Sequence, residues 1–509
     1  MAIDAGGLSV VIPTHDRWPV LRRTLDALSA QTVSGFSVVV VVDGEDQEVP
    51  TLPDHVRVVQ VPHGGPGRAR NAGVQSTDTA LVLFLGDDMI PAPDLVAAHL
   101  SRHERDGGPR VAVLGGVDWH PEVRRTPLLE WIDRAGMQFE LAGVDDDADD
   151  PGWGRFYSCN VSLPRALFDA AGGFDPDFAY YYEDLDLAYR LRDAGMTLRY
   201  EPRARVEHLH SYDEESFARR LRGVATGEFM LTQRRADFVP YFANKFRAVE
   251  GKPVKAVDPW LARFAPVYLD AFEAEQELAE LKDYLGEEYD ETLLRGHQQA
   301  VDAEEAAAVD ELTFYRTSTA YLYDLTVFAM SGTKRPYREE IMRRIGPGSR
   351  LLDYGCGIGS DGIRFREAGY LADFVDFANP STAYLRERLA KRGIDAAVYD
   401  VEKDQPRGYE LAYCFDVIEH VDDPFGFLAR IEETADLVAI NFLEPLPGDV
   451  HVHKPLPIRA LLRHATSHGL VHYSKHYGRS HFVIYHAKRA DFARRVLGLA
   501  RRFRGARRR

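Results

Sequence analysis

The sequence predicts an α/β protein with two separate sheets and a helical segment between them. In the first part of the chain, apolar runs such as Val38–Val42 and Ala80–Leu85 alternate with stretches of helical spacing, and each run ends in polar residues. Near residue 350 another strand leads through a glycine-rich turn into a helix. Alternating strands and helices build parallel sheets, which bind ligands at the carboxyl ends of their strands.

The composition is that of a globular protein with two or three domains, since the chain has 509 residues, of which 45% are hydrophobic. Cys159, Cys356 and Cys414 lie far apart without metal-ligand spacing, which favours a reducing compartment. We see neither a signal peptide nor a stretch of about 20 apolar residues, so we expect a cytoplasmic protein. The net charge of −17 does not exclude nucleotide ligands, and nucleic-acid binding is not predicted because the basic cluster is terminal and lacks stacking aromatics.

The first domain is expected to alternate strands and helices, with ligand-type residues where the strands end. The expected elements are strands over 8–13, 38–42, 56–61 and 80–85, a helix over 20–28, and a helix that begins in the glycine-rich segment 64–73. A glycine-rich turn before a helix binds anions through backbone amides, and Arg68 and Arg70 add positive charge there. This pattern predicts a nucleotide-binding domain.

Asp87 and Asp88 directly follow the strand over 80–85. Two adjacent acids repel each other unless a cation or hydrogen bonds hold them. Mg²⁺ typically takes one or two carboxylates together with phosphate oxygens. The pair therefore indicates either a cation that carries a nucleotide diphosphate or a solvated turn.

Roughly residues 6 to 230 carry an ordered set of motifs. These are Pro13-Thr14 to Arg17, Val42-Asp43, Gly67 to Gly73, Gly86-Asp87-Asp88, Cys159-Asn160, Ala171 to Asp175, Tyr182 to Arg190 and Val206-Glu207-His208. Together they resemble the family-2 glycosyltransferases of the GT-A fold. The resemblance implies an inverting, metal-dependent transfer of a sugar from a nucleotide-sugar to an acceptor.

The same resemblance implies roles for single residues. Nucleotide-sugar contacts are implied for Thr14, Asp16 and Asp43 at the base and ribose, Arg70 at the diphosphate, Asp87 at the ribose or sugar, and also Asn160 and Glu183. Asp88 and His208 would hold Mn²⁺ or Mg²⁺, with His210 as a competitor for His208.

Asp184 is the implied general base, because the acceptor hydroxyl must lose its proton as it attacks the anomeric carbon. The alternative interpretation is that Glu183 and Asp184 only charge the first turn of a helix, where acids are favoured.

Residues 234–309 are expected to form an acidic helical linker. Leu278, Leu281 and Leu285 recur at helical spacing, and fifteen acids against two basic residues lie between Asp270 and Glu311. We interpret the acid run as a solvated helix face and not as a cation site. The aromatic-rich stretch 314–330 is expected to be helical.

The second half contains another ordered set of motifs, over roughly residues 310 to 488. Asp353 precedes glycines at 355, 357 and 359, and Ser360 stands where a dinucleotide fingerprint needs glycine. The set resembles the class I S-adenosylmethionine-dependent methyltransferases, which have a Rossmann-like fold. The resemblance implies S-adenosylmethionine binding by Asp353, Gly355, Gly357 and Gly359 in the turn, Asp376 at the ribose, Asp400 and Val401 at the adenine, and Asp416 after the fourth strand.

Methylation of a sugar hydroxyl would need a base besides proximity and alignment. The candidates are His420 and the pair His451 and His453, and most histidines nearer the C-terminus are interpreted as structural or solvated. His451 and His453 could also ligate a metal, but the sequence shows no third ligand at suitable spacing.

The predicted domains are residues 1–233, 234–309 and 310–488, with a basic tail over 489–509. The tail could contact the inner face of an anionic membrane peripherally, or be a disordered end. The predicted function is the addition of a sugar by one half and methylation of a glycan or related acceptor by the other. The sugar acceptor could be a glycan, a lipid-linked compound, a peptide or a small molecule. The alternative is a single-activity glycosyltransferase whose other half binds a ligand or acts as a scaffold.

Overall fold

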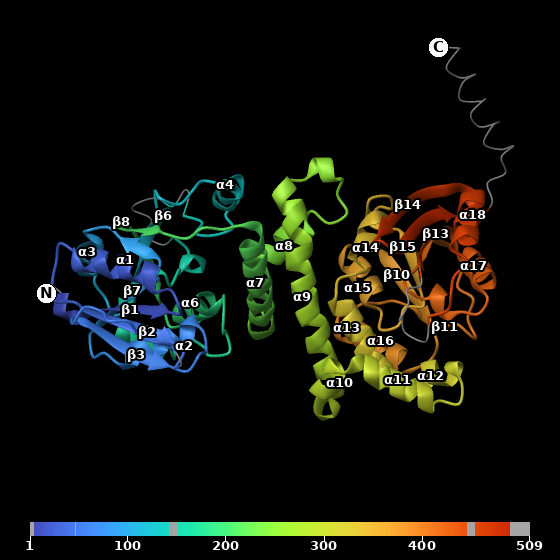
Figure 1. Cartoon of the computed structure of the whole chain (residues 1–509), viewed down its shortest axis with the longest axis horizontal. Coiled ribbons are helices and arrows are strands. Elements are labelled where there is room, and N and C mark those ends of the chain that lie inside the picture. Colours follow the sequence, from blue (N-terminus) through green and yellow to red (C-terminus); the bar gives the residue numbers. More distant parts are fainter. Residues whose placement is uncertain (1–4, 46, 142–143, 145–150, 445–452, 489–509) are drawn as a thin grey trace, which may run out of the picture. The chain divides into compact units, whose positions relative to one another are not determined.

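The structure, a computed structural model, describes residues 5–45, 47–141, 144, 151–444 and 453–488. It divides into two compact units, residues 1–244 and 245–509 (Figure 1). This division falls inside the predicted linker, and the four-part domain division stays a prediction. His451 and the basic tail 489–509 lie outside the described residues.

The described part of the first unit contains an eight-stranded sheet with the order β3-β2-β1-β4-β7-β6-β8-β5. Four of its strands run parallel, as the apolar runs predicted, and β7 then pairs antiparallel with both β4 and β6. The strands are β1 (Leu8–Thr14), β2 (Ser37–Asp43), β3 (Val56–Val61), β4 (Leu81–Leu85), β5 (Met89–Pro91), β6 (Val111–Trp119), β7 (Asn160–Pro164) and β8 (Thr197–His208).

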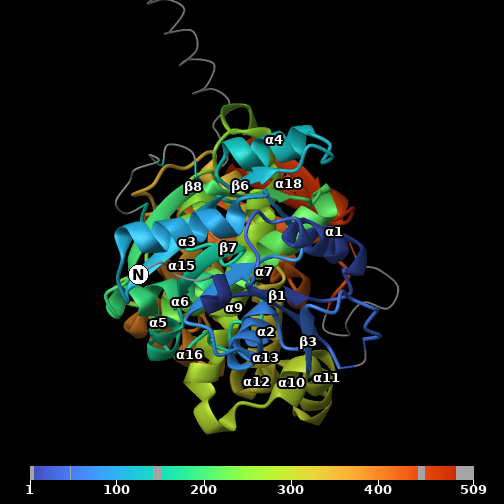
Figure 2. The ribbon, with the colours of Figure 1, turned by 90° about the vertical axis from the view of Figure 1, so that its left-hand side faces the viewer.

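Helices cover both faces of this sheet because successive side chains of a strand point to opposite faces. Leu8, Val10 and Ile12 pack with residues of α1 and α3, whereas Val11 and the alternate residues of β2 pack with α2, α5 and α6. Figure 2 shows α3 and α1 above the sheet and α2 below it. The helices are α1 (Trp18–Ser29), α2 (Pro66–Gln75), α3 (Leu95–Asp106), α4 (Pro127–Arg134), α5 (Arg165–Ala170), α6 (Glu183–Asp193) and α7 (Glu214–Arg234), and α8 (Tyr241–Arg247) spans the boundary between the units.

In the second unit, the described strands form a seven-stranded sheet with the order β11-β10-β9-β12-β13-β15-β14. The first five strands of that order are parallel, and the hairpin of β14 and β15 adds antiparallel to β13. The strands are β9 (Arg350–Tyr354), β10 (Leu371–Asp376), β11 (Val398–Asp400), β12 (Tyr409–Cys414), β13 (Ala435–Leu443), β14 (Leu470–His476) and β15 (Ser480–His486).

Helices also cover both faces of the second sheet. Apolar residues of α17 and α18 pack on one face, and those of α14, α15 and α16 on the other. The helices of this unit are α9 (Pro259–Leu285), α10 (Glu291–Arg295), α11 (His297–Ala307), α12 (Glu311–Thr317), α13 (Ala320–Met330), α14 (Arg335–Met342), α15 (Ser360–Glu367), α16 (Pro380–Lys391), α17 (Pro424–Glu432) and α18 (Ile458–Gly469). The stretch 314–330 is helical except at residues 318–319, where Ser318 accepts from the amide of Tyr321 and thereby caps α13.

The acid run was interpreted as a solvated helix face, and this is wrong for the part of it on α9. Glu277 is 2% exposed, and its carboxylate lies 2.8 Å from Nη2 of Arg388 and 3.2 Å from Nη2 of Arg364. Glu273 pairs in the same way with Arg335 and Arg338. The arginines come from α14, α15 and α16, so α9 is an integral helix of the second unit. Sequence spacing could not show this because the partners are up to about one hundred residues away.

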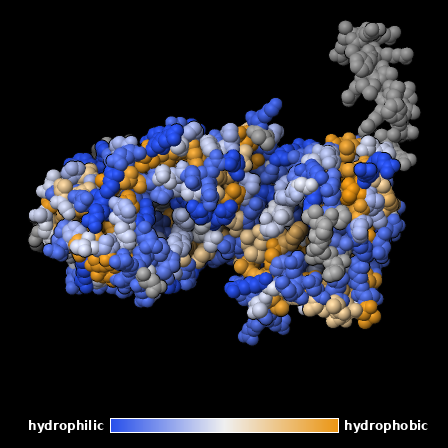
Figure 3. Space-filling model, viewed as in Figure 1, coloured by the Kyte–Doolittle hydropathy of each residue, from blue (hydrophilic) through white to orange (hydrophobic). Residues whose placement is uncertain are grey.

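The face of the molecule in Figure 3 is mostly hydrophilic, with hydrophobic residues scattered over it. Among the described residues, no helix combines the length and the apolar composition that crossing a membrane requires.

Candidate active sites

In the first unit, Asp87 and Asp88 lie buried between β4 and β5. Oγ1 of Thr14 donates to Oδ2 of Asp87 at 2.8 Å. Arg17 spans both acids, with Nη1 2.9 Å from Oδ1 of Asp87 and Nη2 2.6 Å from Oδ2 of Asp88. Burial and then the charge of Asp88 raise the pKa of Asp87 to about 6. The structure thus brings Thr14 and Asp87 together and adds Arg17, whose only sequence signal was its place in the same turn as Thr14.

His208 ends β8, which pairs with β5, and this pairing places its imidazole beside Asp88. Nε2 of His208 is 3.2 Å and Nδ1 of His210 is 3.5 Å from Oδ2 of Asp88. Burial opposes ionisation of Asp88, but the charge of His208 and the hydrogen bonds from both histidines outweigh it and hold the pKa of Asp88 well below its usual range. Within the described residues, the buried Nδ1 of His208 has no hydrogen-bond partner. One carboxylate and two imidazoles within reach of one another fit a divalent cation, so this donor set matches the implied metal.

Asp43 and Asp16 lie beside the glycine-rich turn. The buried carboxylate of Asp43 accepts from the amides of Gly64 at 2.8 Å and Gly65 at 3.0 Å, so it fixes the turn that begins α2. Exposed Asp16 has φ 53° and lines a hollow together with His15 and His63. Both acids are therefore at the carboxyl edge of the sheet.

Arg70 and Glu183 form a buried ion pair, with Nη1 of Arg70 3.1 Å from Oε1 of Glu183. The guanidinium also lies over the ring of Phe174, 5.4 Å from its centroid. Both residues line the same cavity as Asp184.

Asp184 stands in the first turn of α6 after two strained residues. Tyr181 and Tyr182 have φ of 62° and 65°, a region that non-glycine residues rarely adopt and that is common at functional sites. Gly223 of α7 allows this segment to approach, because a Cβ there would lie 2.5 Å from the ring of Tyr181. Burial and then the charge of Glu183 raise the pKa of Asp184 to about 7.

The cavity at Asp184 has a volume of about 510 Å³. Its walls are rich in rings, which include those of Trp153, Tyr157, Tyr181 and Phe242. Arg220 of α7 also lines it, with its guanidinium 5.0 Å from the centroid of Tyr181. Sequence reasoning missed this arginine because α7 lies beyond the motifs.

Asn160, which was expected to contact the nucleotide-sugar, is engaged inside the sheet. Its side chain is 0% exposed, and its amide donates to the carbonyls of Gly116 and Ala204 while its oxygen lies 3.0 Å from Nε2 of His99. These bonds use the side chain to join β6, β7 and β8 inside the sheet. The sequence alone does not show whether a polar residue at the end of a strand faces a ligand or bonds to neighbouring strands, because it does not show which strands are neighbours.

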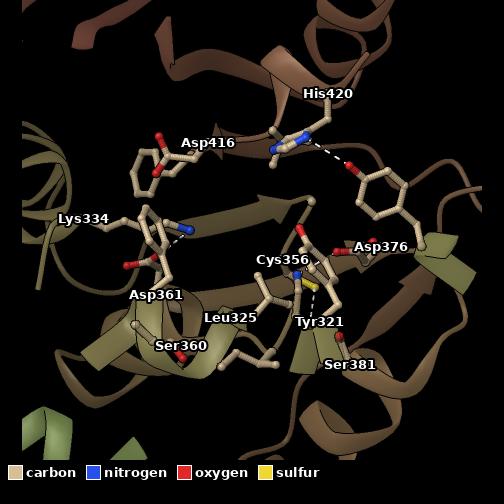
Figure 4. Close-up of a pocket in the computed structure, with 18 of the residues that line it drawn as sticks. Tyr321, Leu325, Lys334, Cys356, Ser360, Asp361, Asp376, Ser381, Asp416 and His420 are labelled. Atoms are coloured by element: carbon tan, nitrogen blue, oxygen red, sulfur yellow. Dashed lines mark hydrogen bonds and ion pairs between the residues drawn. The ribbon is translucent and has the colours of Figure 1, made fainter. Parts of the chain in front are cut away.

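In the second unit, the glycine turn after β9 forms one wall of a cavity of about 600 Å³. The amide of Gly357 donates to Oδ2 of Asp376 at 2.7 Å, which joins the turn to the end of β10. Gly355 has φ +77°, and a Cβ there would lie 2.7 Å from the side chain of Val417, so both its conformation and its space require glycine. In Figure 4, Asp376 lies beside Cys356, and Asp416 and His420 lie across the pocket from Ser360 and Ser381. An open, mixed polar and apolar cavity at a glycine turn fits the implied S-adenosylmethionine.

Asp353 and Asp416 have different surroundings. Asp353 is buried behind the turn, where burial and then the charge of Asp361 raise its pKa to about 8. Asp416 lines the cavity with φ 55°, and its Oδ1 accepts from Nδ2 of Asn441 at 2.6 Å. Asp416 could therefore contact a ligand directly, whereas Asp353 supports the turn.

Asp400 and Val401, which were expected at the adenine, are not among the residues that line this cavity, and their assignment stays a prediction. Oδ2 of Asp400 pairs with Lys403 at 2.5 Å, and its Oδ1 accepts from the amide of Glu402 at 3.1 Å. Val401 packs against the hydrophobic core of the sheet. Phe377 and Asn379, which directly follow β10, line the cavity instead.

His420 and His453 lie together, with ring centroids 5.0 Å apart. Nδ1 of His420 is 3.0 Å from Oη of Tyr315. Both histidines, with Glu419, line a second hollow of about 400 Å³. Burial and then the charge of Asp416 raise the pKa of Glu419 to about 8. Sequence reasoning passed over Glu419 because a single acid in this motif carries no signal of its own.

Comparisons with known proteins found matches to both halves of the chain. Residues 9–156 match the family model of glycosyl transferase family 2, and residues 330–477 match that of a methyltransferase domain. Validoxylamine A glucosyltransferase of Streptomyces hygroscopicus subsp. jinggangensis is 35% identical over 222 residues, which cover 38% of this chain and 52% of that protein. The pre-mycofactocin glycosyltransferase of Mycobacterium tuberculosis is 30% identical over 214 residues, which cover 40% of this chain and 43% of that protein. The chain thus spans about half the length of the curated relatives it matches.

The predicted α/β class and the predicted resemblances are confirmed. The first unit has a sheet with nucleotide-binding topology, and the second has a sheet with a glycine turn at its centre. Both matches are to families of transferases. Residues 9–156 are therefore similar to family-2 glycosyl transferases, and residues 330–477 are similar to methyltransferase domains, both of which are families of enzymes.

Proposed function

We propose that the first unit transfers a sugar from a nucleotide-sugar to an acceptor with inversion, and that the second methylates a glycan or related acceptor from S-adenosylmethionine. Two observations support the proposal. Asp87, Asp88 and His208 gather at the sheet edge of the first unit. The glycine turn of the second unit is bonded to Asp376 at the wall of a large cavity.

In the first unit, the donor would bind along the carboxyl ends of β1, β2 and β4. Asp16 and the hollow beside it would take the base and ribose, and Asp87 would meet the ribose or the sugar. Arg17 would contribute positive charge next to the diphosphate, since its guanidinium already bridges the two acids. Asp88 and His208 would hold Mn²⁺ or Mg²⁺, which when bound offsets the charge of the leaving diphosphate.

Asp184 would act as the general base. It borders the ring-lined cavity, where an acceptor sugar or cyclitol could stack its apolar face on Trp153 or Tyr181. As the acceptor oxygen bonds to the anomeric carbon, Asp184 takes the hydroxyl proton and the bond to the diphosphate breaks. A pKa of about 7 suits this task, because a base is most effective when its pKa is near the working pH.

The glycosyl half is tested by incubating the chain with a panel of nucleotide-sugars and Mn²⁺ and measuring release of nucleoside diphosphate. We expect release from at least one donor. Asp88→Asn should abolish it, and the matched change Asp94→Asn, at the start of α3, should not. If the native chain releases nucleoside diphosphate from no donor, and the two variants behave in the same way, the proposed sugar transfer is ruled out.

In the second unit, Asp376 would accept hydrogen bonds from the ribose hydroxyls of the donor, and the amides of the glycine turn would contact the amino-acid part. His420 or His453 would take the proton of the acceptor hydroxyl as its oxygen bonds to the methyl carbon and the carbon–sulfur bond breaks. Calorimetry with S-adenosylmethionine and transfer of labelled methyl to a glycosylated acceptor test this half. Binding without transfer to any glycan would favour the ligand-binding alternative.

A further inference from the structure

Glu419 is a buried acid whose carboxylate has no hydrogen-bond partner in the part of the chain that the structure describes. It lies in the short turn Ile418–His420 after β12 and is 2% exposed. Within the described ranges of the chain, neither of its carboxylate oxygens has a hydrogen-bond partner. Burying a carboxylate that is not paired is costly, so such groups usually pair or coordinate a metal.

Two imidazoles stand beside this acid. Ligand atoms of Glu419, His420 and His453 all lie within 4.8 Å of one another. Oη of Tyr315 contacts Nδ1 of His420 at 3.0 Å. Such a second contact is typical of histidines that bind metals, because it fixes the orientation of the ring.

A comparable cluster on α17 and α18 shows the difference. Oε1 of Glu432 accepts from Nε2 of His464 at 2.6 Å and from Oη of Tyr485 at 2.9 Å. This acid is satisfied by the protein itself and needs no cation. Among the described clusters of this unit, the Glu419 cluster is the one with a buried carboxylate that lacks hydrogen bonds.

The cluster also has the right position for chemistry. Glu419 and His453 line the hollow of about 400 Å³. His420 and Asp416 line both this hollow and the cavity of about 600 Å³ at the glycine turn, where S-adenosylmethionine is proposed to bind. A ligand bound at the cluster therefore sits where the two spaces meet. Figure 4 shows His420 and Asp416 on the same side of the cavity at the glycine turn.

We propose that Glu419, His420 and His453 bind a divalent transition-metal cation that holds a hydroxyl oxygen of the methyl acceptor next to the donor. One carboxylate and two imidazoles suit Mn²⁺, Fe²⁺ or Zn²⁺ and leave coordination positions open for oxygen. An acceptor with two adjacent hydroxyls, such as a sugar or cyclitol diol, can fill two of them. The proposal rests on the proposed methyl transfer. In it, the bound cation activates the acceptor hydroxyl, and His420 and His453 bind the cation and do not act as the base.

The reaction balances without another reactant. The cation lowers the pKa of the bound hydroxyl, which loses its proton to water. The alkoxide oxygen then bonds to the methyl carbon while the carbon–sulfur bond breaks. The products are a methyl ether and S-adenosylhomocysteine, whose sulfur is neutral.

The test separates the two metal sites of the chain. Metal-free chain is titrated with Mn²⁺, and free Mn²⁺ is counted by electron paramagnetic resonance. We expect two bound ions in the native chain, one in Asp88→Asn, one in Glu419→Gln and none in the double variant. His464→Gln is the matched control, and we expect it to keep both ions.

Binding of S-adenosylmethionine is measured in every variant, because it reports folding of the second unit without needing the cation. We expect Glu419→Gln and His453→Gln to bind S-adenosylmethionine within about threefold of the native chain while their affinity for Mn²⁺ falls at least about tenfold. The proposal is overturned if Asp88→Asn binds no Mn²⁺, or if Glu419→Gln binds as much as its parent. Full methyl transfer in the presence of a chelator would also overturn it and would leave the proposed methyltransferase function standing.

Discussion

The carboxylates that follow the strands differ in what satisfies them. The carboxylates of Asp43 and Asp376 accept hydrogen bonds from backbone amides of glycine-rich turns, so they fix these turns at the edges of the two sheets. Asp88 is held by Arg17 and His208 and stays ionised. Asp184 differs from these acids because burial and then the charge of Glu183 raise its pKa to about 7. The same residue type therefore has different surroundings at these positions, and these surroundings suit the support role of Asp43 and Asp376 and the proposed roles of Asp88 as metal ligand and Asp184 as base.

Asp184→Asn should reduce sugar transfer about 10²- to 10⁴-fold, the usual contribution of a general base. In the native chain, the rate should rise with pH and level off above about 7, because only the ionised carboxylate accepts a proton. Steady-state rates between pH 5.5 and 8.5 check both points. Asp193→Asn, at the other end of α6, is the control and should keep the native rate. A pH-independent rate in the native chain would contradict the assignment.

Asp376→Ala should weaken S-adenosylmethionine binding at least about tenfold, since hydrogen bonds to a charged group contribute about 1.5–3 kcal/mol. Asp400→Ala should leave the affinity unchanged, because that carboxylate is engaged by Lys403 outside the cavity. Isothermal titration calorimetry measures both. Equal losses in the two variants would support the assignment of Asp400 to the adenine.

At the scale of elements, α9 shows how an acidic helix becomes part of a domain. Its Glu273 and Glu277 meet arginines of three other helices, and its Leu281 packs with Leu322 and Tyr384. Oγ of Ser360 donates to Glu277 at 2.9 Å, so the serine that replaces a fingerprint glycine fastens the glycine turn to α9. The helix α9 thus holds the glycine turn in place, and its Glu273 and Glu277 also line the cavity beside that turn.

Glu277→Gln should destabilise the second unit by up to about 3 kcal/mol, because Arg364 and Arg388 lose their most deeply buried counter-charge and keep Glu367 and Glu280, which are partly exposed. Thermal unfolding with and without S-adenosylmethionine identifies the transition of this unit and measures the change. Asp283→Asn changes an exposed acid on the same helix and should alter stability by less than about 0.5 kcal/mol. Equal effects of the two changes would mean that the α9 network does not carry stability.

The same network should make the second unit sensitive to acid. Burial opposes ionisation of Glu277, but Arg388 and Arg364 outweigh it and lower its pKa in the folded state. A lowered folded-state pKa gives stability that is complete above the unfolded-state value and is lost as the pH falls below it. Denaturant midpoints should therefore drop below about pH 4.5 in the native chain. They should drop less steeply in Glu277→Gln.

At the scale of the whole chain, each cavity is lined by residues of a single unit. We therefore expect the two proposed sites to work independently of each other. A change that removes one binding function should leave the other intact.

Asp88→Asn should abolish donor turnover while S-adenosylmethionine binds with the native affinity. In the reverse direction, Asp376→Ala should leave release of nucleoside diphosphate unchanged. Calorimetry and a diphosphate assay on the same preparations check both. A loss of both functions in either variant would contradict independent sites.

The sequence by itself predicted the four parallel strands of the first sheet, and the strand and glycine-rich turn at the start of the second. These features follow from local patterns, because apolar runs predict buried strands and a glycine turn has few other uses. Thr14, Asp87, Asp88 and His208 could be brought together only by the ordered motifs, and the structure places them in contact or close to it.

Only the tertiary structure decided which polar residues face a cavity. Asn160 and Asp400 have the same local signal as true ligands, but strand neighbours and Lys403 satisfy them. Arg17 meets Asp87 and Asp88 across about 70 residues of sequence, Arg220 reaches its cavity from α7, and the acids of α9 have partners on α14, α15 and α16. The reason is physical: whether a polar group binds a ligand depends on which partners surround it, and packing between distant segments sets those partners.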